Sequence, residues 1–153
     1  MKLYLIQHGE ALSKDTDPGR ALSEAGRKDV QRVASFLAGK VRVARVLHSG
    51  KTRARQTAEI LAAAVVPDLE AEQFGGLSPN DPVEPFVQHV EEWDEDLLVV
   101  GHLPFMEKLV ARLATGAGER SIVAYRPGSI VCLETGEGSG WKVRWMIRPE
   151  LLP

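Results

Sequence analysis

The chain has 153 residues, of which 44% are hydrophobic and 26% are charged. This composition is that of an ordinary globular protein and argues against a disordered or membrane-spanning chain. The formal net charge of −2 indicates no broad basic surface for nucleic acid, so any anion site must be local. We expect a single domain, residues 1–153, that is large enough to bury a substantial core.

Two features bear on where the protein works. The single cysteine, Cys132, lies in an apolar run and cannot form an internal disulfide, so we expect it to be a small buried residue. The N-terminus has no long apolar segment after Lys2, which argues against a secretion signal. We therefore expect a cytoplasmic protein that does not act on membranes.

The first part of the chain alternates between strand and helix patterns. Residues 2–6 predict a strand, and residues 8–22, rich in aspartate, proline and glycine, predict a long loop. A helix is expected over residues 23–38, capped by its first serine and ended by Gly39. Residues 44–48 predict the second strand.

The middle of the chain continues this alternation. Ser49 is expected to cap a second helix that runs to about Val65, and a short strand should cover residues 69–72. Asp81 then provides a helix cap, followed by a proline and a glutamate in the first turn, and this helix should end near Trp93.

The last part contains the most apolar strand pattern. Residues 96–101 are typical of a strand that is buried on both faces, and a helix follows over residues 104–114. Residues 129–134 and 141–147 flank a glycine-rich turn and predict an antiparallel hairpin. The alternation predicts an α/β fold, a three-layer α/β/α sandwich around a mainly parallel sheet with antiparallel edge strands.

Hydrophobic periodicity predicts which side chains are buried. On the first two helices an apolar residue recurs every three or four positions. The core residues predicted in this way are Val30, Val33, Ala34, Leu37, Ala54, Ala58, Leu61 and Val65. Strict alternation would also place Trp141 and Trp145 on one face of the last strand, where we expect them in the core.

Three of the four histidines follow predicted strands. His8 comes after the first strand, His48 ends the second, and His102 follows the apolar run at 96–101. Ligands of parallel α/β sheets bind at the carboxyl ends of the strands, so these side chains are candidates for one site. We expect His48 to lie in the wall of that site, and His89, within a helix, to face solvent.

The helix after Ser49 adds positive charge at the same edge, because its free N–H groups and its dipole favour an anion. Helical spacing places Arg53 at the margin of the buried face, from which it can clamp an anion. Arg55 should point into solvent beside Glu59. Lys51 could lie at the rim of the site or simply be exposed.

Four motifs together resemble the histidine phosphatase superfamily. His8-Gly9 follows the first strand, residues 49–58 match S-x-x-x-R-A-x-Q-T-A, and residues 101–104 match G-H-x-P. Residues 20–26, R-A-L-S-E-A-G, are similar to the R-P-L-T-x-x-G segment that leads into the first helix. The resemblance covers most of the chain in the same order and implies a phosphoglycerate mutase-like fold.

The resemblance also implies a role for each matched residue. His8 matches the nucleophile, which takes a phosphoryl group onto a ring nitrogen and then passes it to water, and which must therefore be neutral. Arg53 and His102 match the groups that hold the phosphoryl oxygens. The implied phosphate-binding residues are Gln7, Gly9, Ser49, Arg53 and His102. No metal or other cofactor is implied, since side chains and a helix N-terminus supply the positive field.

Gln7 departs from the superfamily pattern, which has arginine before the histidine. Glutamine keeps a hydrogen-bond donor but loses the charge and the bidentate fork. A charged hydrogen bond contributes roughly 1.5–3 kcal/mol and a neutral one about 1, so the expected loss is about ten- to thirtyfold in rate. We therefore expect activity to be reduced but retained.

The substrate is suggested by the short spacing between two site residues. Arg53 and His102 are 49 positions apart (102 − 53), which leaves no room for a large capping insertion. We expect a shallow, open site suited to a phosphorylated side chain of another protein, as in the compact SixA-type phosphohistidine phosphatases of this superfamily. Glu10 and Glu72 are candidates for the proton donor, and either could equally be a surface carboxylate.

Three other interpretations stay open at this point. The protein could be a degenerate phosphatase that binds phosphate or phosphohistidine without turnover, because Gln7 replaces the arginine. It could instead hydrolyse small phosphomonoesters. Finally, His8, His48 and His102 could bind zinc, although that would leave the Arg53 helix unexplained.

Overall fold

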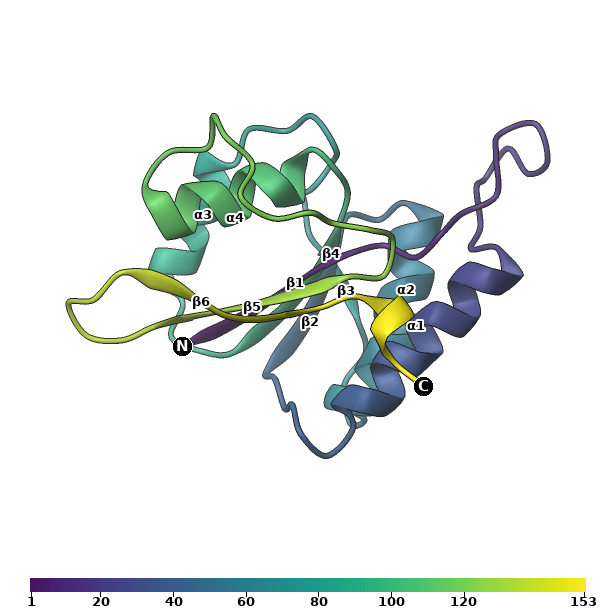
Figure 1. Ribbon diagram of the computed structural model, residues 1–153, viewed down its shortest axis with the longest axis horizontal. Coiled ribbons are helices and arrows are strands. Elements are labelled where there is room, and N and C mark those ends of the chain that lie inside the picture. Colours follow the sequence, from purple (N-terminus) through teal and green to yellow (C-terminus); the bar gives the residue numbers. More distant parts are fainter.

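A six-stranded sheet forms the centre of the computed structural model, which describes residues 1–153. Its strands lie in the order β3-β2-β4-β1-β5-β6 (Figure 1). They are β1 (Lys2–Gln7), β2 (Arg45–His48), β3 (Glu72–Gln73), β4 (Leu97–Gly101), β5 (Ile130–Thr135) and β6 (Trp141–Ile147). The first four strands pair in parallel, and β5 and β6 add an antiparallel hairpin at one edge. The mixed sheet confirms the predicted α/β class.

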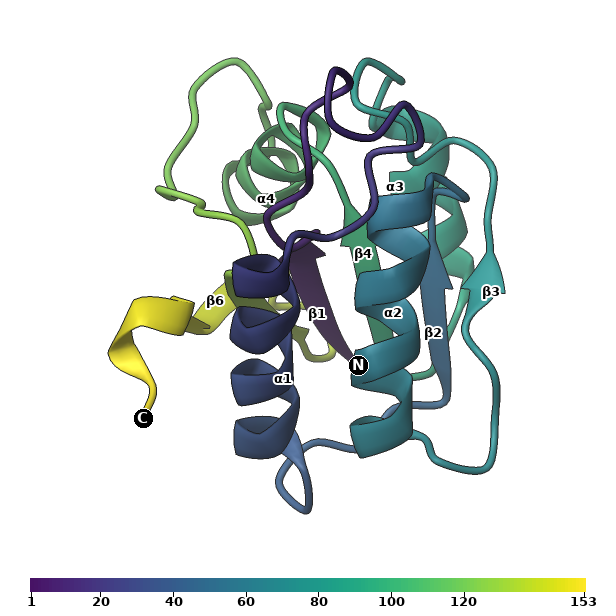
Figure 2. The same ribbon diagram turned by 90° about the vertical axis from the view of Figure 1, so that its right-hand side faces the viewer.

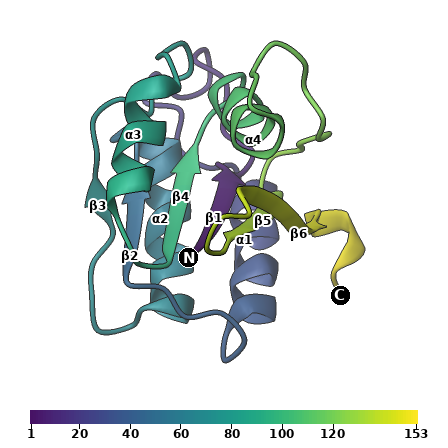
Figure 3. The ribbon, with the colours of Figure 1, turned by 90° about the vertical axis from the view of Figure 1, so that its left-hand side faces the viewer.

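Two pairs of helices cover the faces of the sheet. The first pair is α1 (Glu24–Leu37) and α2 (Thr52–Val65), which lie on one face (Figure 2). The second pair is α3 (Glu84–Glu92) and α4 (Phe105–Thr115), which lie on the other face (Figure 3). A short 3-10 turn, Pro149–Leu151, follows the last strand. None of the helices has the length and apolar character that crossing a bilayer would require.

The strands divide their side chains between two cores because successive residues point to opposite faces. Tyr4 and Ile6 of β1 pack with α1 and α2, whereas Leu3 and Leu5 pack with α3 and α4. All eight core residues predicted on the first two helices are buried. Cys132 is 1% exposed, as predicted for a small buried residue.

Three element boundaries differ from the predictions. Ser49 does not cap α2, because Gly50 turns the chain through a φ of +92° and the helix starts only after it. Asp81 does not cap α3 either; its carboxylate accepts a loop N–H at 2.9 Å, and the helix starts at Glu84. The strand predicted over residues 69–72 is instead the two-residue β3.

A bulge in β6 overturns the prediction for two tryptophans. Neighbouring residues of β5 pair with Val143 and Trp145, so Arg144 is an extra residue in the strand. One extra residue reverses the direction of every side chain beyond it. Trp141 therefore packs on the α3–α4 core and Trp145 on the α1–α2 core, and both are half-buried.

Candidate active site

Side chains from three distant segments meet at the carboxyl edge of the parallel strands. His8 follows β1, His102 follows β4, and Arg53 lies in the first turn of α2. The ring centroids of the two histidines are 4.9 Å apart. The Nε of Arg53 donates to Nε2 of His8 at 3.3 Å. The predicted convergence of these three residues is therefore present.

His8 is held in a single tautomer. Its Nδ1 lies 2.7 Å from the Gly9 carbonyl oxygen, which can only accept, so Nδ1 carries the proton. The Nε2 lone pair then faces the Arg53 guanidinium. Burial, together with the charges of Arg53 and Arg20, lowers the pKa of His8 to about 4. At neutral pH the residue is an uncharged imidazole whose Nε2 lone pair accepts the hydrogen bond from Arg53.

His102 is 1% exposed and is held by Ser49. The Ser49 hydroxyl lies 2.6 Å from Nε2 of His102, so the residue predicted as a helix cap positions this ring instead. Burial lowers the pKa of His102 to about 3, and the neighbouring His8 and Arg53 contribute in the same direction. Nδ1 of His102 is buried without a hydrogen-bond partner.

Thr57 and Gln56 hold two loops against α2, a role that was not predicted for either residue. The Thr57 hydroxyl accepts the Gly9 N–H at 3.0 Å and donates to the Arg53 carbonyl at 2.8 Å. The side-chain oxygen of Gln56, Oε1, accepts the Leu22 N–H at 2.8 Å. The signal in the sequence was a polar residue, Thr57, between the apolar positions Ala54, Ala58 and Leu61 of the buried face of α2. Thr57 thereby links the backbone of Gly9, on which His8 rests, to the helix that carries Arg53.

Two glycines beside the histidines serve helix packing. A Cβ on Gly9 would lie 2.7 Å from the Val30 side chain of α1, and one on Gly101 would lie 2.7 Å from Sδ of Met106 in α4. Both strand ends must therefore carry glycine for the helices to pack this closely. The Gly9 N–H is also engaged by Thr57, so it is not a free donor toward a ligand.

Gln7 ends β1 directly beside the site. It is 8% exposed and pairs in register with Gly101, the residue before His102. Its side-chain oxygen is buried and has no hydrogen-bond partner. A buried polar atom without a partner costs roughly 1–3 kcal/mol, so this position is not optimised for stability.

The protein-family model for the histidine phosphatase superfamily (branch 1) matches residues 3–77. Over 155 aligned positions the chain is 29% identical to the phosphohistidine phosphatase SixA of Escherichia coli (strain K12), with 97% of this chain and 94% of that protein covered. The chain belongs to the histidine phosphatase superfamily. It is a phosphatase of the SixA type.

Two further comparisons agree with this assignment. The solved structure of the protein histidine phosphatase SixA complexed with tungstate superposes with a TM-score of 0.84 at 28% identity, covering 99% of each chain. An uncharacterized protein of a Picosynechococcus strain is 34% identical over 124 residues, which cover 76% of this chain and 74% of that protein. The phosphatase thus matches SixA over essentially its whole length.

Several predicted candidates lie outside the cluster of site residues. His48 accepts the Gly50 N–H on Nδ1 at 3.0 Å and so holds the turn between β2 and α2. Glu72 forms an ion pair with Arg45 at 3.1 Å. His89 is exposed, as predicted. No group of three histidine, cysteine or carboxylate side chains is placed to hold a metal ion, so the zinc interpretation has no ligand set.

Three charged residues predicted near the site, Arg55, Lys51 and Glu10, are exposed. Arg55 pairs with Glu59 at 3.0 Å on the solvent face of α2, as predicted. Lys51 is exposed, and its charge contributes to the lowered pKa of His102, so it lies near the rim. Glu10 is exposed and accepts a hydrogen bond from the Ser23 hydroxyl at 2.9 Å.

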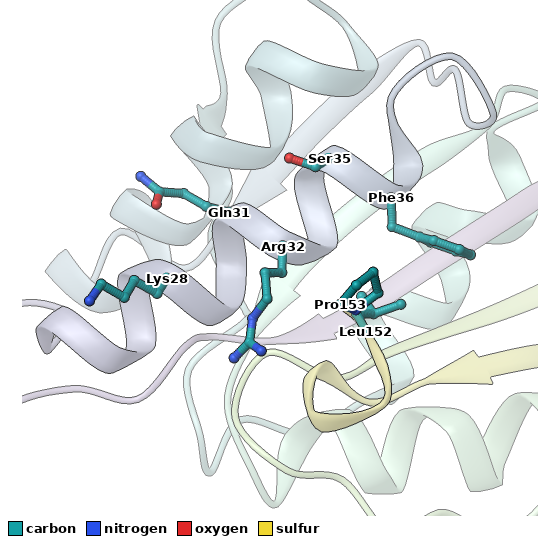
Figure 4. A pocket seen from close by; sticks show the side chains of 7 residues that line it. All are labelled: Lys28, Gln31, Arg32, Ser35, Phe36, Leu152 and Pro153. Carbon is teal, nitrogen blue, oxygen red and sulfur yellow. The ribbon is translucent and has the colours of Figure 1, made fainter.

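The site of the phosphatase is not a deep cavity. None of its five main cavities is lined by His8, Arg53 or His102. A hollow of about 700 Å³ lies elsewhere, between the outer face of α1 and the C-terminal residues Leu152 and Pro153 (Figure 4). The shallow, open site stays a prediction.

Proposed function

We propose that residues 1–153 act as one phosphatase domain that hydrolyses phosphohistidine on a signalling protein through a covalent intermediate on His8. The observation that carries this proposal is the state of His8: a neutral imidazole whose Nδ1–H is held at 2.7 Å by the Gly9 carbonyl and whose Nε2 lies 3.3 Å from a guanidinium. A nucleophile and a cation for the phosphoryl oxygens are thereby adjacent.

The first step transfers the phosphoryl group to the enzyme. The Nε2 lone pair of His8 attacks phosphorus, an N–P bond forms on His8, and the P–N bond of the substrate breaks. The leaving imidazole takes up a proton, for which exposed Glu10 is the candidate donor. Arg53 and His102 hold the equatorial phosphoryl oxygens, with His102 oriented by Ser49.

The second step returns the enzyme to its starting state. A water oxygen attacks phosphorus, the N–P bond on His8 breaks, and its electron pair returns to Nε2. Inorganic phosphate leaves, and the water gives up a proton to the group that protonated the leaving imidazole. The Nδ1–H bond to Gly9 stays in place throughout and preserves the tautomer.

The open site and the SixA relative support a protein substrate. The phosphorylated imidazole of another protein can approach a surface that no main cavity encloses. Small phosphomonoesters are the second candidate, since an open site also admits them. Because partners of this kind are phosphorylated signalling proteins, we place the phosphatase in the cytoplasm.

The test is to trap the intermediate. The protein is mixed with a histidine-containing protein phosphorylated by phosphoramidate, or with p-nitrophenyl phosphate, and quenched in SDS at alkaline pH. Intact-mass spectrometry should show one added phosphoryl group that is lost in acid. His8→Ala should show none and lose at least about a thousandfold in turnover, whereas His89→Ala, an exposed histidine away from the site, should behave as the parent. Phosphate binding without turnover or adduct would instead make the protein a binding module.

A further inference from the structure

The site has one positive charge fewer than the superfamily pattern, because Gln7 stands where that pattern has arginine. Gln7 is neutral, and its buried side-chain oxygen has no partner. Arg53 is the one arginine that forms a hydrogen bond with His8. A phosphoryl group in transfer spreads negative charge over three oxygens, and a second guanidinium would stabilise it further.

Arg20 lies in a loop that is held by its own hydrogen bonds. The Asp17 carboxylate accepts the N–H groups of Gly19 at 3.2 Å and Ala21 at 2.9 Å. The Leu12 N–H donates to the Ala21 carbonyl at 2.8 Å, which closes the loop. Immediately after this loop, the Leu22 N–H donates a hydrogen bond to the Gln56 side chain of α2. The position of Arg20 is thus set by backbone contacts on both sides.

The backbone of Arg20 is itself unusual. Its φ of +51° makes it the one non-glycine residue of the protein in the left-handed region. An ordinary side chain there costs roughly 1–2 kcal/mol, and such positions concentrate at functional sites. The side chain is anchored by its Nε, which donates to the Leu12 carbonyl at 3.0 Å.

The outer end of the Arg20 side chain has no partner. Its two terminal nitrogens make no hydrogen bond and no ion pair. Among the half-buried arginines, only Arg20 and Arg53 lack a carboxylate partner. Two partly buried guanidinium groups that have no carboxylate partner can bind an anion, because their N–H groups form strong hydrogen bonds with phosphate oxygens.

The charge of Arg20 reaches every residue of the cluster. It lowers the pKa of His8, of Arg53 and of His102, which come from three different segments of the chain. The loop is also placed there by contacts of Leu22, two residues after Arg20. The Leu22 N–H donates to the Gln56 side chain of α2 at 2.8 Å, and Cδ2 of Leu22 would lie 3.2 Å from a Cβ on Gly9. The segment that carries Arg20 therefore packs against both the helix of Arg53 and the residue after His8.

We propose that Arg20 is a second phosphoryl-binding arginine, whose terminal N–H groups donate to the phosphoryl oxygens and supply the charge that Gln7 lacks. The role rests on the proposed function for its catalytic consequence, but it also predicts anion binding in the absence of turnover.

The first test compares Arg20→Gln, which removes the charge, with Arg20→Lys, which keeps it, and with Lys14→Gln, which removes an exposed cation of the same loop. The measurements are the Kd of inorganic phosphate by calorimetry and kcat/KM for p-nitrophenyl phosphate. Arg20→Gln should weaken phosphate binding about tenfold and lower kcat/KM about ten- to a hundredfold, Arg20→Lys should lose less, and Lys14→Gln should stay within about twofold. Thermal unfolding checks that all variants fold.

The second test asks whether Arg20 stands in for the charge missing at Gln7. The gain from Gln7→Arg should be at least about threefold larger in the Arg20→Gln background than in the parent, because the two charges serve one anion. Equal gains in both backgrounds, or an Arg20→Gln variant that behaves like Lys14→Gln, would overturn the proposal. If the parent binds phosphate through Arg20 but never turns over, the proposed phosphatase mechanism fails while this role of Arg20 stands.

Discussion

The two sides of the site differ in how completely their polar atoms are bonded. On the α2 side, Thr57 bonds both Gly9 and Arg53, and Arg53 in turn donates to His8. On the strand side, the Gln7 side-chain oxygen and Nδ1 of His102 are buried without partners. The helix side is therefore rigid and preorganised, whereas the strand side carries a stability cost at the positions nearest to the substrate.

The largest effect on both stability and activity is expected from removing the Thr57 hydroxyl, which accepts the Gly9 N–H. Thr57→Val leaves the buried Gly9 N–H without an acceptor and should reduce the free energy of unfolding by about 1–3 kcal/mol. Because His8 rests on the carbonyl of the same glycine, kcat/KM should fall at least about tenfold. Thr57→Ser keeps the hydroxyl and should retain most of both quantities. Urea unfolding and steady-state kinetics measure them, and equal losses in the two variants would contradict the link.

A second effect, of opposite sign and confined to activity, is expected from Gln7, whose side-chain oxygen has no hydrogen-bond partner. Gln7→Arg restores the superfamily residue and should raise kcat/KM by up to about thirtyfold, since a charged donor replaces a neutral one. Gln7→Leu removes the unpaired oxygen, so the protein should become no less stable while kcat/KM falls. A parent that is inactive and is not rescued by Gln7→Arg would mean that the site has become one for binding alone.

The last effect concerns the pH dependence of His8. Burial places the pKa of His8 at about 4, below its ordinary 6.5, so the unfolded chain binds the extra proton over that window. Stability should therefore decline as the pH falls from about 6.5 to about 4, while kcat/KM keeps no acid limb from His8 above about pH 5. Imidazole NMR titration measures the pKa directly. A His8 that titrates near its ordinary 6.5 would contradict the burial to which the lowered pKa is attributed.

Local pattern was enough to predict most of the fold. Alternating apolar residues placed β1 and β4, and the three-to-four-residue repeat identified the buried faces of α1 and α2. The errors were also local in kind. A glycine delayed the start of α2, and one extra residue at Arg144 separated Trp141 from Trp145. The conformation of a turn and the presence of a bulge depend on a single residue. A hydrophobic repeat is evaluated over many residues, so it does not detect them.

The sequence by itself determined that His8, Arg53 and His102 share one edge of the sheet, because parallel strands carry their carboxyl ends to the same side. Only the tertiary structure decided what supports them. The Thr57 hydroxyl meets Gly9 across 48 positions of the chain, and the free fork of Arg20 depends on a loop held by its own hydrogen bonds. Such contacts follow from how whole elements pack, and no short stretch of residues encodes them.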